Sequence, residues 1–155
     1  MTANGGRVLL AYDGSENAGR AIAVAGELLG PRPALVLHLW ESWAAEAPAL
    51  AGTSAAVHGM AAELDAIADQ QSREHATHGA ELATRAGFEA EAVSERARGP
   101  IWRSLLDVAG EQDCAAIVVG SRGLSGISRM LGSVSNGVVH HSRRPVLVVP
   151  GEGHR

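Results

Sequence analysis

Residues 115–133, AAIVVGSRGLSGISRMLGS, give the clearest indication of the fold class. The stretch begins with an aliphatic run at 115–119, which is typical of a strand covered on both faces of a sheet. A glycine-rich turn follows, and Ser133 is the candidate N-cap of a short last helix at 133–141. A buried strand that leads through a turn into a helix indicates a parallel α/β sheet.

The rest of the chain repeats this alternation. Apolar runs that predict further strands lie at residues 8–12, 35–40 and 146–149, and a weaker run at 88–93 alternates apolar and charged residues as an edge or near-edge strand does. Helical spacing and end signals predict helices at 15–29, about 60–85 and 100–110. The order predicts one α/β domain over residues 1–155, with its core at about 6–150, and helices on both faces of a parallel sheet with right-handed crossovers.

Composition narrows the class of protein. Apolar residues make up 46% of the 155 residues but aromatic residues only 3%, so the core must consist of Val, Leu, Ile and Ala. The net charge of -4, without a basic stripe, argues against a nucleic-acid partner. All 13 basic residues are arginine, which excludes a Schiff-base lysine and a P-loop lysine.

The chain offers no sign of export or of a membrane. Cys114 is the only cysteine, so an internal disulfide and a cysteine metal site are both excluded, and we expect it to be a small core residue, with a redox role as the alternative. No signal-peptide h-region is visible at the N-terminus, and no apolar run reaches the ~18 residues that span a bilayer. We therefore expect a cytoplasmic protein.

The glycines lie where a ligand would be expected. In an open parallel sheet, ligands bind beyond the carboxyl ends of the strands, where the strand order reverses. Residues 12–14 and 119–121 stand at two such ends. Glycines let backbone N–H groups approach an anion, Ser133 and Ser135 add hydroxyl groups at a helix N-terminus, and Arg122 and Arg129 add positive charge. The alternative is a flexible surface loop rich in Gly and Ser, since neither the G-x-G-x-x-G nor the P-loop pattern is present.

Two strings resemble the universal stress protein family. GSRGLSGISRMLGSVSNGVVHHSRRPVLVVP, from residue 120, is similar to its carboxyl-terminal signature of G-x2-G, a spacer of about nine residues, and G-[S/T]. VLLAYDGSENAGRAIAVAGELL, from residue 8, is similar to its strand that ends in Asp-Gly-Ser and enters a helix. The resemblance implies a Rossmann-like sandwich of the adenine nucleotide α-hydrolase type. Its five-stranded parallel sheet would have the order 3-2-1-4-5.

The resemblance also implies an ATP site. Asp13 matches the residue that contacts adenine, and Leu39 a position whose backbone meets the base. Gly120 and Gly123 match the glycines beneath the ribose and phosphates. Around the triphosphate lie Gly132, Ser133 and Ser135, with Val134 in backbone contact. The remaining positions that we assign to the nucleotide are Ala11, Tyr12, Ser15, Val119 and Arg122.

The spacer departs from the family pattern. It runs over residues 124–131, which is eight residues where the ATP-binding members show about nine. One residue fewer shifts Gly132 relative to Gly123 by a few Å. We therefore expect adenine nucleotide binding more firmly than binding of the triphosphate, and we leave open ATP or ADP, with or without Mg²⁺.

A catalytic set is not visible in the sequence. His75 and His78 are spaced to share a metal, but no third ligand is identifiable, so we interpret them as a solvated helix face. We expect His140 and His141 to cap the last helix. Asp13 is the one carboxylate placed at the strand ends, which does not make a hydrolase. Three functions stay open: an ATP-binding regulatory module in the stress response, a weak ATPase or phosphotransferase, and a protein-interaction member of the family that binds no nucleotide.

Assembly is suggested by the last strand. Val146–Val149 would lie at a sheet edge and expose unpaired backbone groups, and the family resemblance implies a homodimer through this strand.

Residues 42–59, rich in Ala and Gly, show no clear periodicity. They are either a loop at the ligand crevice, an irregular extension of the next helix, or a surface insertion.

Overall fold

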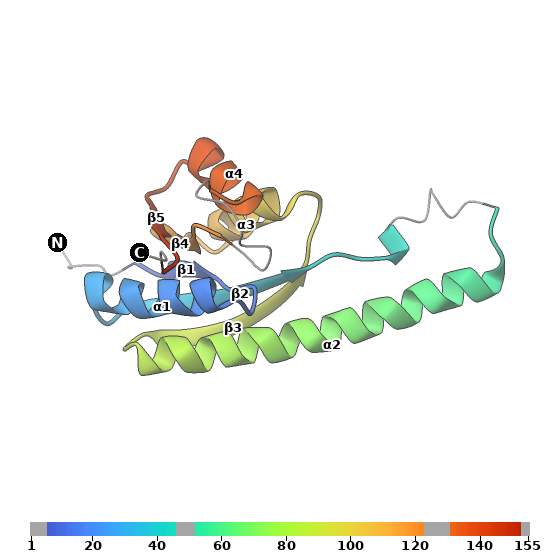
Figure 1. Ribbon diagram of the computed structural model, residues 1–155, viewed down its shortest axis with the longest axis horizontal. Helices are drawn as coiled ribbons and strands as arrows, with labels where there is room; N and C mark the ends of the chain where they lie inside the picture. Colours follow the sequence, from blue (N-terminus) through green and yellow to red (C-terminus); the bar gives the residue numbers. More distant parts are fainter. Residues whose placement is uncertain (1–5, 46–51, 123–130, 153–155) are drawn as a thin grey trace.

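The computed structural model describes residues 6–45, 52–122 and 131–152 (Figure 1). Within them, a parallel sheet of five strands has the order β3-β2-β1-β4-β5. The strands are β1 (Val8–Ala11), β2 (Pro33–Trp40), β3 (Glu89–Arg96), β4 (Ala116–Gly120) and β5 (Val146–Val149). This order confirms the predicted topology. The strand order reverses between β1 and β4, which pair directly with each other.

The sheet is covered on both faces, as the apolar runs predicted (Figure 1). Helices α1 (Glu16–Leu29) and α2 (Ala55–Arg85) cover one face, and α3 (Ile101–Glu111) and α4 (Ser133–His141) cover the other. Because side chains alternate along a strand, Val8 and Leu10 of β1 join the core between the sheet and helices α1 and α2. Leu9 joins the core between the sheet and helices α3 and α4. All three side chains are fully buried.

The end signals of α1 behave as predicted. The Ser15 hydroxyl accepts a hydrogen bond from the Ala18 N–H at 3.1 Å, which satisfies one of the free donors of the first turn. Gly30, at φ 69°, ends the helix in a conformation that favours glycine. At α4 the predicted bounds of 133–141 are confirmed, but the predicted N-cap was wrong: Gly132 is the N-cap and Ser133 is the first helical residue.

Helix α2 is longer than its sequence pattern indicated. It spans 31 residues from Ala55, so residues 55–59 of the segment without clear periodicity form regular helix. Its C-terminal half packs on the sheet through the small buried residues Ser72, Ala76, Gly79 and Ala83. A Cβ at Gly79 would lie 2.7 Å from the Tyr12 ring, so the absence of a side chain permits this close approach. The N-terminal half projects beyond the sheet (Figure 1).

A smaller difference concerns one strand. The edge strand β3 was expected at residues 88–93, and it continues to Arg96 because all eight of its residues pair with β2. Its edge position was predicted correctly.

No helix in the described part of the chain is long and apolar enough to cross a membrane.

Candidate functional site

A cavity of about 490 Å³ lies at the carboxyl ends of β1, β2 and β4. The ends of β1 and β2 contribute four of the predicted site residues to its lining, Ala11, Tyr12, Asp13 and Leu39. The end of β4 and the start of α4 contribute Val119, Gly120, Arg122, Gly132, Ser133, Val134 and Ser135. The fold therefore brings together residues that lie more than a hundred positions apart in the chain. Gly123 and Arg129 fall outside the described residues.

The sequence interpretation missed part of the cavity wall. Leu37 of β2 and Ala18 of α1 line it, as do Ile101 and Leu105, one helical turn apart on α3. Glu41, which follows β2, adds a second carboxylate to the lining of the cavity. Helical spacing predicted this helix at 100–110, but spacing alone does not tell a core face from a cavity wall.

Asp13 is held by the turn into α1. Its Oδ1 accepts a hydrogen bond from the Ser15 N–H at 2.9 Å. Gly14 sits at φ 84°, where a Cβ would also lie 3.0 Å from the His75 ring. Ser15 is not among the residues that line the cavity, and its hydroxyl caps α1 instead. Ser15 thus supports the position of Asp13.

Asn17, which the sequence interpretation also missed, ties the ends of β4 and β5 together. Its Oδ1 accepts hydrogen bonds from the Arg122 N–H at 2.9 Å and from the Ser121 hydroxyl at 3.5 Å. Its Nδ2 donates to the Val149 carbonyl at 3.2 Å. A Cβ at Gly120 would lie 3.0 Å from this amide, so glycine allows the contact. No sequence pattern marks Asn17, because its partners lie more than a hundred residues away.

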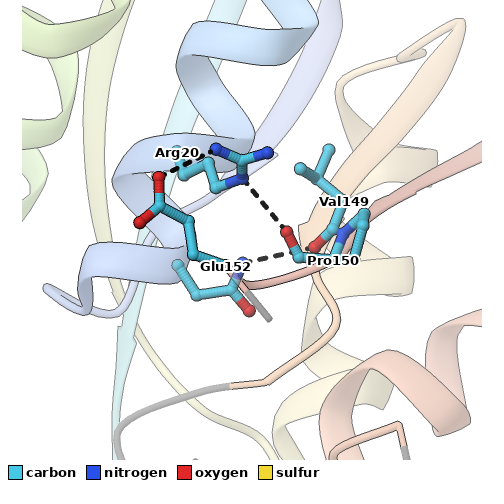
Figure 2. Close-up of polar contacts among 5 residues, drawn as sticks. Arg20, Val149, Pro150 and Glu152 are labelled. Carbon is cyan, nitrogen blue, oxygen red and sulfur yellow. Dashed lines mark hydrogen bonds and ion pairs between the residues drawn. The ribbon is translucent and has the colours of Figure 1, made fainter. Parts of the chain in front are cut away.

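The residues after β5 lie against α1 (Figure 2). Arg20 Nε donates to the Pro150 carbonyl at 3.2 Å, and Nη1 of the same guanidinium lies 3.3 Å from the Glu152 carboxylate. The Gly151 N–H donates to the Ser121 hydroxyl at 3.3 Å. The ion pair is solvent-exposed and therefore contributes little. The hydrogen bonds to the backbone hold this segment beside the turn after β4.

The N-terminus of α4 faces the cavity, and within the described residues no side chain caps it. The Gly132 N–H donates to the Ser121 carbonyl at 2.8 Å. The buried Ser135 hydroxyl is 3.0 Å from both the Ser121 and the Gly132 carbonyl oxygens, so its proton is engaged within the protein. What α4 offers a ligand is therefore its first-turn N–H groups, the exposed Ser133 hydroxyl and the positive end of the helix dipole.

Histidines line the contact between α2 and the sheet. The Tyr12 hydroxyl lies 2.8 Å from His78 Nδ1, and the His38 and His75 rings stack at 4.9 Å. The prediction that His75 and His78 form a solvated face was thus incomplete: both are exposed, yet each contacts a residue of the β1 or β2 end. Within the described residues, no three His, Cys, Asp or Glu side chains are grouped to hold a metal.

Burial shifts the pKa values of two side chains at this contact, His38 and Tyr12. Burial and the neighbouring His75 lower the pKa of His38 to about 4, against a smaller opposite effect of Asp13, so His38 is neutral at neutral pH. Its Nδ1 lies 2.7 Å from the Ser72 hydroxyl. Burial, and secondly the Asp13 carboxylate, raise the pKa of Tyr12.

The fold defines a doubly wound α/β protein with a cavity at its topological switch point. The model of the universal stress protein family matches residues 6–150. The chain is also 31% identical to universal stress protein YxiE of Bacillus subtilis over 146 residues, which cover 92% of this chain and 97% of the relative. The protein belongs to the universal stress protein family.

Solved structures agree with this fold. Hypothetical protein MJ0577 superposes with a TM-score of 0.76 at 21% identity, over 96% of this chain and 98% of that one. A universal stress protein in complex with cAMP gives a TM-score of 0.59 at 23% identity, over 94% and 96% of the two chains. The universal stress protein of Archaeoglobus fulgidus in complex with dAMP gives 0.60 at 22% identity, over 93% and 96%.

Proposed function

We propose that the protein is a regulatory module that binds an adenine nucleotide in the cavity between Asp13 and α4. The observation that carries the proposal is the pairing of two environments in one cavity. One end is an apolar slot beside a carboxylate, and the other is a helix N-terminus that no side chain of the described residues caps. An adenine ring fits the first, where a carboxylate can accept from its exocyclic amine, and a phosphate fits the second.

The size and charge of the cavity support this ligand class. Its volume of about 490 Å³ falls in the range of small-molecule sites. Arg122 is the one cation among the described lining residues, beside the carboxylates of Asp13 and Glu41. Two relatives of the same fold are described in complex with adenine nucleotides that carry one phosphate. ATP is the ligand that the family resemblance implies, and Mg²⁺ would offset its additional charge.

Calorimetry tests the proposal. The wild-type protein is titrated with ATP, ADP, AMP and cyclic AMP, each with and without Mg²⁺. We expect at least one to bind with a dissociation constant below millimolar, and Asp13→Ala to weaken it by roughly 10- to 100-fold, because a hydrogen bond to a charged group is lost.

Ser15→Ala is the matched control for Asp13. It removes the cap of the same helix but keeps the Asp13 carboxylate and the residue 15 backbone N–H that holds it, so it should bind nucleotide with near wild-type affinity. If none of the four nucleotides binds more tightly than millimolar, the protein belongs among the members that work by protein contact alone, and the proposal is wrong.

We further propose that two copies pair along β5. This strand is at the sheet edge. The Ile117 and Ser121 N–H groups donate to the Pro145 and Val149 carbonyls, so the backbone groups of Val146 and Val148 point to the open side. An unpaired edge of this kind is a template for a second strand.

A further inference from the structure

An exposed apolar stripe runs along the projecting half of α2. We call Val57, Met60, Leu64 and Ile67 the α2 stripe. Their exposed fractions are 36%, 61%, 40% and 53%, although side chains of this kind are usually buried. Figure 1 shows the start of α2 extending well beyond the sheet that covers its other half. The stripe therefore lies on a part of the helix that the sheet does not cover.

The spacing of the stripe is that of a coiled-coil seam. Its residues are separated by three, four and three positions, which places Val57 and Leu64 at a positions and Met60 and Ile67 at d positions of two heptads. The next a and d positions are Gln71 and Glu74, both polar and exposed. The apolar seam thus stops where the C-terminal half of α2, which packs on the sheet, begins.

The projecting half of α2 needs packing against another surface to be stable as a helix. An isolated helix of about 12–15 residues is marginal in water, and the projecting half has roughly that length. In the described structure its tertiary hydrogen bonds are those of Asp65, which accepts from the Ser42 hydroxyl and the Trp43 N–H. Leu64 and Ile67 stay exposed beside this contact. Cover for the seam would stabilise the projecting half.

We propose that the α2 stripe pairs with the α2 stripe of a second copy of this chain, as a short parallel coiled coil. The four side chains expose on the order of 350 Å² per copy, so a pair buries roughly 700 Å², which is below the size of a stable specific interface. The pairing is accordingly weak and concentration-dependent.

Charge selects the direction of the pair. In this heptad Glu63 occupies a g position, and the e positions are held by Ala61 and Ala68. In a parallel pair Glu63 faces the second copy's Ala68, whereas in an antiparallel pair it faces the second copy's Glu63. Like charges in direct opposition are destabilising, so the parallel pair is favoured. Ala68 is small enough to let the two helices approach closely, whereas Ala61 is already buried within the chain.

Sedimentation of the full chain tests the pairing. The stripe variant carries Leu64→Glu with Ile67→Glu, and the control carries Ala62→Glu with Ala66→Glu, at exposed positions on the opposite side of the same helix. We expect the mass-average of the wild type and of the control to rise with concentration to about twice that of the stripe variant. Circular dichroism checks that all three are folded. The same comparison in a Val148→Pro background excludes a contribution from β5.

Disulfide trapping gives a second measurement that introduces no charge. A parallel pair places the two copies of residue 64 within disulfide reach, so Leu64→Cys should form a covalent dimer under mild oxidation, while Ala66→Cys should not. The native Cys114 is buried. Equal sedimentation of the wild type and the stripe variant at every concentration would overturn the proposal, and so would failure of Leu64→Cys to cross-link. In the first case the stripe is covered by the chain itself or by a different protein.

Discussion

At the scale of single residues, Asn17 has a structural role that lies outside the predicted site. Its amide joins the turn after β4 to the end of β5. We predict that Asn17→Ala lowers the free energy of unfolding by about 1–3 kcal/mol, because the Arg122 N–H loses its partner and the Val149 carbonyl loses one of its two hydrogen bonds. It should also weaken nucleotide binding, since Arg122 lines the cavity. Urea denaturation and calorimetry measure the two effects.

Asn136→Ala is the control for this prediction. Asn136 is an exposed asparagine in the first turns of α4. Its truncation should change the free energy of unfolding by no more than about 0.5 kcal/mol. Equal effects of the two substitutions would contradict the role assigned to Asn17.

His38 makes stability depend on pH. Its pKa is about 4 in the folded protein, lowered first by burial and then by His75, while Asp13 acts in the opposite direction. Between pH 6.5 and 4 the unfolded chain therefore binds a proton that the folded chain does not, and the free energy of unfolding falls as the pH falls. We predict a loss of roughly 1–2 kcal/mol over this window, after allowance for the partial exposure of the ring.

The measurement is urea denaturation at several pH values between 4 and 7. His38→Gln, which keeps a polar side chain beside Ser72, should flatten the pH dependence. His140→Gln, at an exposed position of α4, should leave it unchanged. The assignment to His38 fails if the wild type and His38→Gln show the same slope.

The residue scale also shows how far sequence reasoning reaches. Asp13, Gly120 and Gly132 could be predicted to lie near one another because each directly follows a strand or precedes a helix in a fixed topology. Asn17 could not, because a hydrogen bond across a hundred residues leaves no local pattern. The Ser135 hydroxyl was expected to face a ligand, whereas it bonds the backbone of its own turn.

At the scale of elements, Asp65 fastens the segment after β2 to α2. Its carboxylate accepts hydrogen bonds from the Ser42 hydroxyl at 2.5 Å and the Trp43 N–H at 2.7 Å. The hydrogen bond from Ser42 is the main reason that the pKa of Asp65 is lowered. The stabilisation is thus present above the ordinary carboxyl pKa and is lost as the pH falls through the folded value.

We predict that Asp65→Ala accelerates hydrogen exchange of the Trp43 amide about 10-fold or more, since one hydrogen bond to a charged group is removed. Exchange mass spectrometry measures this. Asp69→Ala, which loses an exposed ion pair with Arg73 one turn further along α2, should leave the Trp43 amide unaffected. Unchanged exchange in Asp65→Ala would mean that other contacts hold this segment.

The start of α2 marks the limit of prediction for elements. The four predicted helices and five predicted strands are all present in the described structure, because their apolar periods were clear. Residues 55–59 carry Ala, His and Gly, with Val57 as the one large apolar side chain, so no periodicity revealed the first turns. The helix continues there although this half packs little against the sheet.

At the scale of the whole molecule, the open side of β5 determines assembly. Proline at position 148 removes a donor that points away from β4, so the hydrogen bonds between β4 and β5 are retained. We predict that Val148→Pro dissociates the proposed β5 dimer while the chain stays folded, as sedimentation and circular dichroism would show. Val148→Ile, which keeps the donor, is the control. A dimer that persists in Val148→Pro does not depend on this edge.

Because α2 contacts Tyr12 closely at Gly79, a small change in the orientation of α2 there would produce a larger movement at its N-terminal tip. The docked half acts as the fixed end, and the tip at Ala55 lies about 25 Å from Ser72 along the helix. A rotation of only 5° at the docked half would move the tip by about 2 Å, which is half the width of a side chain. Tyr12 lines the cavity and also contacts Gly79. A displacement of Tyr12 too small to alter the sheet would therefore be amplified at the far end of the helix.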